Sequence, residues 1–255
     1  MAAATDPARA RNALLTASAL AWMVILAGSS GGTVFSHCPA AASGATPFVV
    51  SFWTQLAMNS PASLAGGWCL MLVAMMAPTV VAPVLHARLR SLRRRRARAT
   101  LLVLVAFGAV WMAAGVVLLT IEMAENAIAS GPYWPAAAAA AVAIVWQCSP
   151  LKQRCLNRCH LHLQVRAFGG AADLDTIRLG LRHGFWCVGS CWALMAAPML
   201  LPRAHVLGMM LAWVPMLAER LEDPAPPSWR WRGLGKLKRI AIARVRVRLN
   251  KLGFI

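Results

Sequence analysis

Six long apolar stretches run through this chain, and most of its charged residues lie in the segments between them. The stretches cover about residues 13–30, 64–85, 100–121, 133–148, 180–200 and 204–220. Hydrophobic residues make up 59% of the chain and charged residues 13%, which leaves too little polar surface to cover a water-soluble globule. Helices of this length match the thickness of a lipid bilayer. We therefore expect an all-α, polytopic membrane bundle of about six transmembrane helices.

The distribution of Lys and Arg predicts how this bundle is oriented. Seven arginines lie between the second and third stretches, at residues 88–98, and ten basic residues follow the sixth, from Arg220 to Lys251. The segment 31–63 between the first and second stretches has none. Because basic loops remain on the cytoplasmic side, we expect both termini to be cytoplasmic. The first stretch is then expected to be an uncleaved span of a multi-pass protein in the cytoplasmic membrane.

The net charge of +18 would suggest a nucleic-acid binder in a soluble protein. Here the basic residues are confined to blocks beside apolar spans, so we expect contacts with anionic lipid headgroups and no nucleic acid. The chain divides into a six-span domain, 1–222, and a basic cytoplasmic tail, 223–255, which contains Trp229 and Trp231. The alternating pattern of residues 240–248 favours an extended ribbon for that part of the tail.

Two pairs of cysteines with identical spacing are the strongest candidates for chemistry. Cys155 and Cys159 follow the fourth stretch in a cytoplasmic loop, and Cys187 and Cys191 lie in the fifth stretch near the same side. Residues at positions i and i+4 share one face of a helix, so each pair can present two thiols together. The cytoplasm keeps thiols reduced, which argues against stable disulfides. Cys38 falls in an outer loop, where oxidation or contact with incoming metal is expected.

Other soft or ionisable side chains are expected at the same depth. His183 precedes Cys187 by one helical turn and extends the ladder of Cys187 and Cys191 along one face. The remaining candidates are Met75 and Met76 in the second stretch and Glu219 at the end of the sixth. Glu219 has two interpretations, a carboxylate at the membrane interface or a buried group paired with a cation or a metal.

Thiolate and thioether ligands favour Cu(I), while zinc fits where thiolates and imidazoles dominate. The predicted metal ligands are therefore Cys155, Cys159, Cys187, Cys191, Met75, Met76, His183 and Glu219. No phosphate-binding loop and no Ser/His/Asp set is present in the sequence. We expect a protein that is not an enzyme.

Several motifs resemble a bacterial family of predicted metal-binding integral membrane proteins that is largely uncharacterised. The resemblance covers about residues 13–222. It rests on Met71-Leu-Val-Ala-Met-Met-Ala-Pro78, Ser149-Pro-Leu-Lys152 leading to the first cysteine pair, Cys187-Val-Gly-Ser-Cys-Trp-Ala-Leu-Met195, and Gly208-Met-Met210 leading to Glu219-Arg220. The resemblance implies metal binding in the bacterial inner membrane.

Two positions depart from the family pattern. Ser190 stands where the family has the first of two adjacent cysteines, and Arg220 stands where it has lysine. Adjacent helical residues point about 100° apart, so Cys191 can be a ligand while residue 190 faces away.

Three functions remain open at this point. The first is binding, delivery or transport of Cu(I) at a Cys/Met site in the cytoplasmic half of the bundle. The second is a non-catalytic assembly or scaffold subunit of a larger membrane complex, with a membrane-protein partner docked on the basic tail. The third is a membrane thiol-disulfide oxidoreductase, although such relays usually carry Cys-x-x-Cys and connect to the oxidising side.

Overall fold

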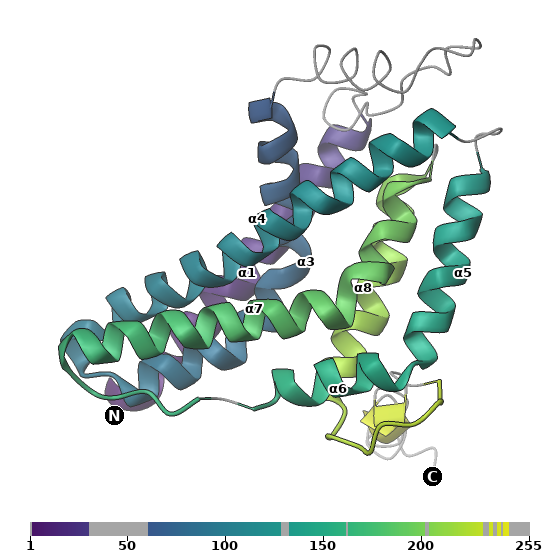
Figure 1. Cartoon of the computed structure of the whole chain (residues 1–255). Coiled ribbons are helices and arrows are strands. Elements are labelled where there is room, and N and C mark those ends of the chain that lie inside the picture. The colour runs from purple at the N-terminus through teal and green to yellow at the C-terminus, as the bar shows by residue number, and fades with distance from the viewer. Residues whose placement is uncertain are drawn as a thin grey trace, which may run out of the picture.

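The computed structural model is built from α-helices throughout the residues that it describes (Figure 1). These residues are 2–30, 61–128, 133–161, 163–201, 204–231, 235–236, 239–240 and 242–244. The helices are α1 (Ala2–Ser30), α3 (Pro61–Arg90), a 3-10 turn (Arg93–Arg95), α4 (Arg96–Ile128), α5 (Trp134–Cys148), α6 (Pro150–Cys159), α7 (Gly169–Met199) and α8 (His205–Leu221). The predicted all-α class is confirmed, and no strand occurs in the described residues.

Each of the six predicted apolar stretches corresponds to a helix, but fewer helices than expected could cross a membrane. Among the described residues, three are long and apolar enough, namely Asp6–Gly28, Ala62–Arg90 and Arg93–Glu122. The bent pair α5 and α6 would make a fourth. Helix α8 has only 17 residues, and α7 interrupts its apolar half with His, Gly and Ser. By length and composition, the count of six spans is therefore not supported.

The segment after α5 was expected to be a loop, and this expectation is wrong. Residues Pro150–Cys159 form the helix α6, which is bent by 67° from α5 and lies across the lower ends of α5 and α8 in Figure 1. Its composition is polar, so a search for apolar stretches overlooks it. Because α6 is helical, its two cysteines are held on a regular scaffold that packs against α7.

Helices α4 and α7 pack closely because glycines on α7 leave room for the backbone of α4. A Cβ at Gly180 would lie 2.7 Å from the Val103 carbonyl oxygen, and one at Gly184 would lie 3.0 Å from the Val110 side chain. The contacts advance along both helices in the same direction, so α4 and α7 run parallel. This close approach fixes the height at which the cysteines of α7 face the rest of the core.

The other long helices complete the core around α7. Helix α1 packs along α3, where the Ser18 hydroxyl donates a 2.6 Å hydrogen bond to the Ala74 carbonyl. Helix α3 packs along α4, where the Trp68 indole donates a 3.0 Å hydrogen bond to the Trp111 carbonyl. Since the polar atoms of these contacts are paired, the helices can bury them together with the apolar side chains.

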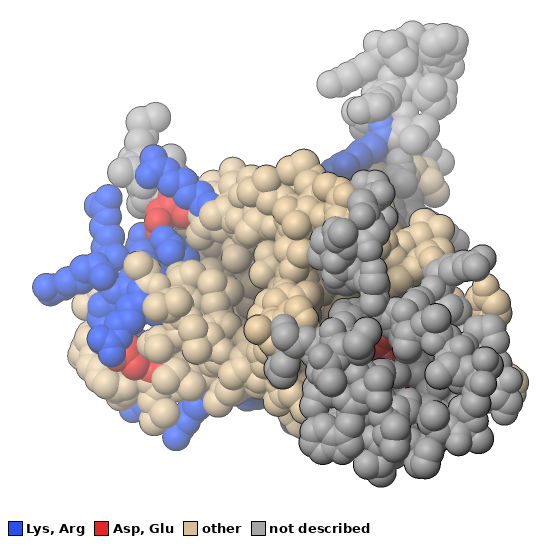
Figure 2. Space-filling view, turned by 90° about the horizontal axis from the view of Figure 1, so that it is seen from above, with Lys and Arg blue, Asp and Glu red and all other residues tan. Residues whose placement is uncertain are grey.

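Basic side chains gather at one end of the long helices (Figure 2). There Asp6 accepts from Arg88 at 2.7 Å and from Arg96 at 2.9 Å, which ties α1 to α3 and α4. Asp173, near the start of α7, accepts from Arg95 and Arg98, each at 2.7 Å. The same end of four helices therefore carries the arginine block.

The prediction of an extended ribbon in the basic tail is wrong for the part that the structure describes. Ile240 and residues 242–244 are helical. The alternating pattern of Ile, Ala and Arg favours a strand, but the helix propensity of Ala and Arg is high. In this segment the helix propensity determines the local structure.

Candidate metal site

The geometry of the site begins at the bend between α5 and α6. Ser149 ends α5 in an extended conformation, and its hydroxyl accepts a 3.1 Å hydrogen bond from the Lys152 backbone N–H. Pro150 occupies the first turn of α6, where its missing N–H costs nothing and its fixed φ suits a helix. A Ser-Pro pair therefore starts α6 in a new direction and turns Lys152 inward.

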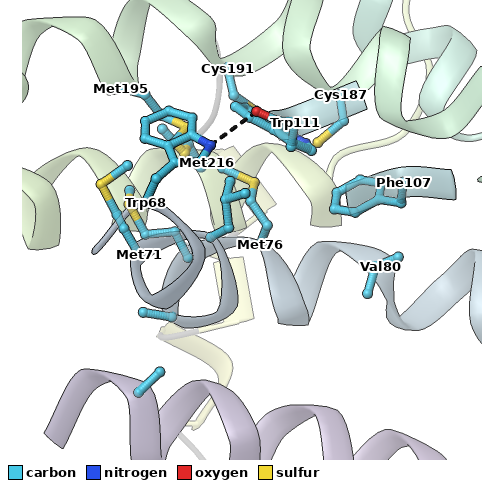
Figure 3. Packing of buried hydrophobic residues seen from close by; sticks show 14 of the residues in the cluster. Trp68, Met71, Met76, Val80, Phe107, Trp111, Cys187, Cys191, Met195 and Met216 are labelled. Atoms are coloured by element: carbon cyan, nitrogen blue, oxygen red, sulfur yellow. Dashed lines mark hydrogen bonds between the residues drawn. The ribbon is translucent and has the colours of Figure 1, made fainter. Parts of the chain in front are cut away.

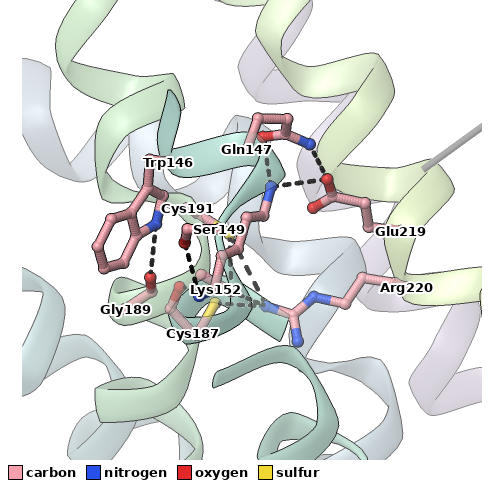
Figure 4. A network of polar contacts seen from close by, with 10 residues as sticks. Trp146, Gln147, Ser149, Lys152, Cys187, Gly189, Cys191, Glu219 and Arg220 are labelled. Atoms are coloured by element: carbon pink, nitrogen blue, oxygen red, sulfur yellow. Dashed lines mark hydrogen bonds and ion pairs between the residues drawn. The ribbon is translucent and has the colours of Figure 1, made fainter. Parts of the chain in front are cut away.

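Lys152 forms a buried ion pair with Glu219 of α8 (Figure 4). The Lys152 ammonium lies 2.6 Å from Glu219 Oε1, and the two side chains are 4% and 3% exposed. The side-chain amide of Gln147, at the end of α5, accepts from the ammonium and donates to the carboxylate. Because each charge has a partner and a further hydrogen bond, the pair can be buried. It joins α5, α6 and α8 at one point.

The next residue of α8, Arg220, points at the cysteines of α7. Its Nη2 lies 3.1 Å from the Cys187 sulfur and 3.8 Å from the Cys191 sulfur. Both thiols are buried, at 0% and 2% exposure, and they interact with each other across one turn of the helix. A guanidinium in this position can balance the negative charge of a thiolate, which is the form that binds soft metals.

Ser190 does not face away from the site. Its hydroxyl is buried, lies 3.3 Å from the Cys191 sulfur and accepts a 3.3 Å hydrogen bond from Arg220 Nη2. It also donates to the Cys187 carbonyl at 2.9 Å. Residue 190 was expected to face away from the metal site, and this expectation is wrong. The Arg220 guanidinium lies between Cys187 and Cys191, where it also contacts Ser190.

The two cysteines of α6 come to the same region, as their common depth suggested. A Cβ placed on Gly189 of α7 would lie 2.8 Å from the Cys155 sulfur, so α6 rests directly on this glycine. Cys159 is buried, and its thiol interacts with Arg220 and Ser190. All six cysteines that the structure describes are free thiols, and three of them, Cys159, Cys187 and Cys191, interact with the Arg220 guanidinium.

Met75 and Met76 also reach this core. Their exposed fractions are 0% and 1%, and they belong to the buried cluster that contains Cys159, Cys187 and Cys191. The Thr79 hydroxyl lies 4.0 Å from the Met76 sulfur and 4.0 Å from the Cys187 sulfur, so it bridges the thioether and the thiol. The methionines of α3 are therefore neighbours of the thiols of α7.

Two predicted ligands are engaged elsewhere. Glu219 is buried and paired with a cation, as one of its two interpretations had it, and that cation is Lys152. The His183 ring packs against Phe107, with ring centroids 5.8 Å apart. Within the described part of the chain, no group of three or more His, Cys, Asp or Glu side chains is arranged to hold a metal ion. Cys38, which was expected in an outer loop, lies outside the described residues.

Two members of this site, Lys152 and Arg220, were not among the ligands predicted from the sequence. Lys152 was named only within the Ser149–Lys152 motif and Arg220 only as a basic residue that departs from the family pattern, and neither was assigned a part in the site. For Lys152, the signal was the Ser149-Pro150 pair just before it, which predicts a helix start and not a loop. For Arg220, the signal was its place beside an acidic residue at the C-terminal end of an apolar helix, where an unpaired buried charge is costly.

The fold and the site together define a class: an all-helical protein with a buried cluster of thiols and thioethers around one arginine. A family model described as a copper chaperone, PpoB2, matches residues 65–238, which is more than half of the chain and includes every residue of this site. The chain belongs to this copper chaperone family. No curated protein and no solved structure matches the chain.

The buried ion pair generates a stability prediction. Lys152→Met leaves Glu219 charged without its cation, and we expect a loss of about 3 to 5 kcal/mol in the free energy of unfolding. The double variant Lys152→Met/Glu219→Met removes both charges and should recover most of that loss. Thermal unfolding of the detergent-solubilised full chain measures both effects.

The exposed ion pair of Lys236 with Asp223 serves as the matched control. Its side chains are 39% and 81% exposed, so Lys236→Met should cost less than about 1 kcal/mol. A Lys152→Met variant no less stable than Lys236→Met would contradict the structural role assigned to the buried pair.

Proposed function

We propose that this protein binds Cu(I) at the buried cysteines and delivers it from within the bacterial inner membrane. The observation that carries the proposal is the position of the Arg220 guanidinium, 3.1 Å from the Cys187 thiol in a family of copper chaperones. Cu(I) prefers few, soft ligands, and two thiols on adjacent turns supply them. Cys155 and Cys159 stand beside this pair and can take the ion onward by ligand exchange.

Charge balance explains why an arginine belongs in this site. Two thiolates and one Cu(I) carry a single net negative charge, which is costly to bury without a partner. The Arg220 guanidinium supplies the compensating positive charge, and its planar set of donors reaches Cys187 and Ser190 together. The neighbouring charges, Lys152 and Glu219, already cancel each other. The copper-loaded site is then neutral as a whole.

The roles of the remaining predicted ligands follow from their neighbours. Met75 and Met76 lie in the same buried cluster as Cys187, so they add thioethers to the surroundings of the dithiol. His183 supports the ligand helix through Phe107. Glu219 holds α6 in place through Lys152, so its effect on copper is indirect. Zinc remains the alternative cargo, disfavoured by the thioethers.

We place the bundle in the membrane with its arginine block at the cytoplasmic face, against anionic lipid headgroups. Large apolar side chains stay exposed along α1, α4 and α5, as lipid-facing side chains do, for example Leu20 at 57%, Val105 at 61% and Val145 at 59%. In this arrangement α7 and α8 cross with the long helices, both termini lie inside, and α6 lies at the cytoplasmic boundary.

The segment after α8 extends this arrangement. The Asn157 side chain of α6 donates to the Ala225 carbonyl at 2.8 Å, and the Arg230 backbone donates to the Cys148 carbonyl at 3.2 Å. The segment therefore packs against α6 at the cytoplasmic boundary. There the exposed Trp229 and Trp231 would lie at the level of the lipid headgroups. A membrane-bound acceptor of copper would meet the protein on this face.

Copper content tests the proposed site directly. We expect Cys187→Ser/Cys191→Ser to lower the copper bound per purified chain by at least half, because the thiolates are the strongest ligands in the cluster. Inductively coupled plasma mass spectrometry of the full chain, loaded with Cu(I) under reducing conditions, measures it. Cys69→Ser is the matched control, since Cys69 is an exposed thiol on α3. Equal copper content in the natural chain, the Cys187→Ser/Cys191→Ser variant and the Cys69→Ser variant would refute the proposal.

Substitutions at Arg220 test whether its charge neutralises the copper-loaded dithiol. Arg220→Met keeps a long side chain but removes the charge, and we expect Cu(I) affinity to fall by at least about tenfold, which corresponds to about 1.4 kcal/mol. Arg220→Lys keeps the charge and should retain more affinity than Arg220→Met. Competition with a Cu(I) chelator gives the dissociation constants. An Arg220→Met variant that binds Cu(I) as tightly as the natural chain would refute the neutralising role.

A further inference from the structure

Methionines fill much of the core beside the dithiol of Cys187 and Cys191. The chain has 13 methionines, and among those the structure describes, seven are buried in the same region of the molecule. They are Met71, Met75, Met76, Met195, Met199, Met209 and Met216. Leucine would fill the same volume with fewer conformers, so packing alone does not call for a thioether at so many positions.

On α7 the sulfur atoms follow one another at a fixed interval. Cys187, Cys191, Met195 and Met199 are each four residues apart, and all are less than 9% exposed. Side chains at this spacing share a helix face, and each step advances about 6 Å along the axis. The face that carries the dithiol therefore continues as a line of thioethers, away from the basic end of the helix.

Thioethers from two other helices meet this line. Met216 of α8 and Met76 of α3 are each 1% exposed and belong to the same buried cluster as Met195. Figure 3 shows Met76, Met195 and Met216 in one group with Trp68 and Trp111, and Cys187 and Cys191 next to this group. The Thr79 hydroxyl, 4.0 Å from both Met76 and Cys187 sulfurs, marks where the thioether group joins the dithiol.

The chemistry of this group differs from that of the dithiol. Three neutral sulfurs leave Cu(I) with its positive charge, and the indole faces of Trp68 and Trp111 can stabilise a buried cation. The Trp68 N–H is already satisfied by the Trp111 carbonyl at 3.0 Å, and both indoles belong to the buried cluster that holds the three methionines. Thioethers hold Cu(I) less tightly than thiolates do, so an ion placed here would move on to the dithiol.

We propose that Met76, Met195 and Met216 form a second, all-thioether Cu(I) station, through which copper reaches Cys187 and Cys191. The proposal rests on the proposed function, because the station feeds the dithiol. It adds a binding site without a cysteine and a direction of passage along α7.

Selenomethionine makes the station visible. The full chain carrying Cys187→Ser/Cys191→Ser is produced with selenomethionine, loaded with excess Cu(I), and measured by X-ray absorption at the copper edge. We expect a copper–selenium scattering path, which only methionine can supply. Adding Met76→Leu/Met195→Leu/Met216→Leu should abolish it, while the exposed pair Met23→Leu/Met210→Leu should leave it in place. No copper–selenium path, or one that survives the triple substitution, would overturn the station.

A loading experiment separates this proposal from the proposed function. In the chain with its cysteines intact, offered one equivalent of Cu(I), the triple leucine variant should bind the same final amount of copper as the natural chain, but several-fold more slowly. Transfer from a coloured Cu(I) chelate, followed by stopped-flow absorbance, gives the rate. Equal rates would overturn passage through the thioethers while leaving the dithiol site standing. If the natural chain does not bind copper at all, the proposed function itself is refuted.

Helix content by circular dichroism shows whether the leucine variants fold. Exchange of methionine for leucine keeps the side-chain volume nearly constant, so the core should remain packed. A triple variant that does not fold is replaced by Met195→Leu alone, for which a partial loss of the copper–selenium path is expected and an unchanged path would contradict the station.

Discussion

The buried pair of Lys152 and Glu219 is the interaction on which the arrangement of the site depends. It lies where α5, α6 and α8 meet, and Gln147 ties both charges to the end of α5. Two buried charges are tolerated only when each is paired, so the position of α6 is coupled to that of α8. Because α6 carries two of the cysteines and α8 carries Arg220, this coupling brings the thiols and their counter-charge together.

The polar groups in this core have two different roles, since some hold the helices together and one faces the thiols. Lys152, Glu219 and Gln147 satisfy one another and leave no net charge. Arg220 has only sulfur and hydroxyl groups in contact, among the interactions the structure describes, so its charge is directed at the thiols. We propose that a Cu(I) dithiolate completes that balance. The thioethers of α3, α7 and α8 then offer a neutral, soft surrounding from which water is excluded.

Much of the helical framework follows from the sequence, because each of the six long apolar stretches forms a helix. Helix α6 is harder to predict because it is short and polar. The sequence signal for it is the N-cap residue Ser149 followed by Pro150. The meeting of the two cysteine pairs was predicted from their common depth. Arg220 and Lys152 were missed, because counting basic residues for topology treats each as exposed, while tertiary pairing determines which are buried. Ser190 was misjudged for the same reason, since its environment comes from α8.

The central claim is that one copper ion is held by sulfur beside Arg220. X-ray absorption of the full, natural chain loaded with one equivalent of Cu(I) tests it most directly. We expect a Cu(I) edge with two or three sulfur atoms bound to copper and no bound nitrogen or oxygen. Copper ligated by nitrogen or oxygen, or a purified chain that retains no copper, would contradict it.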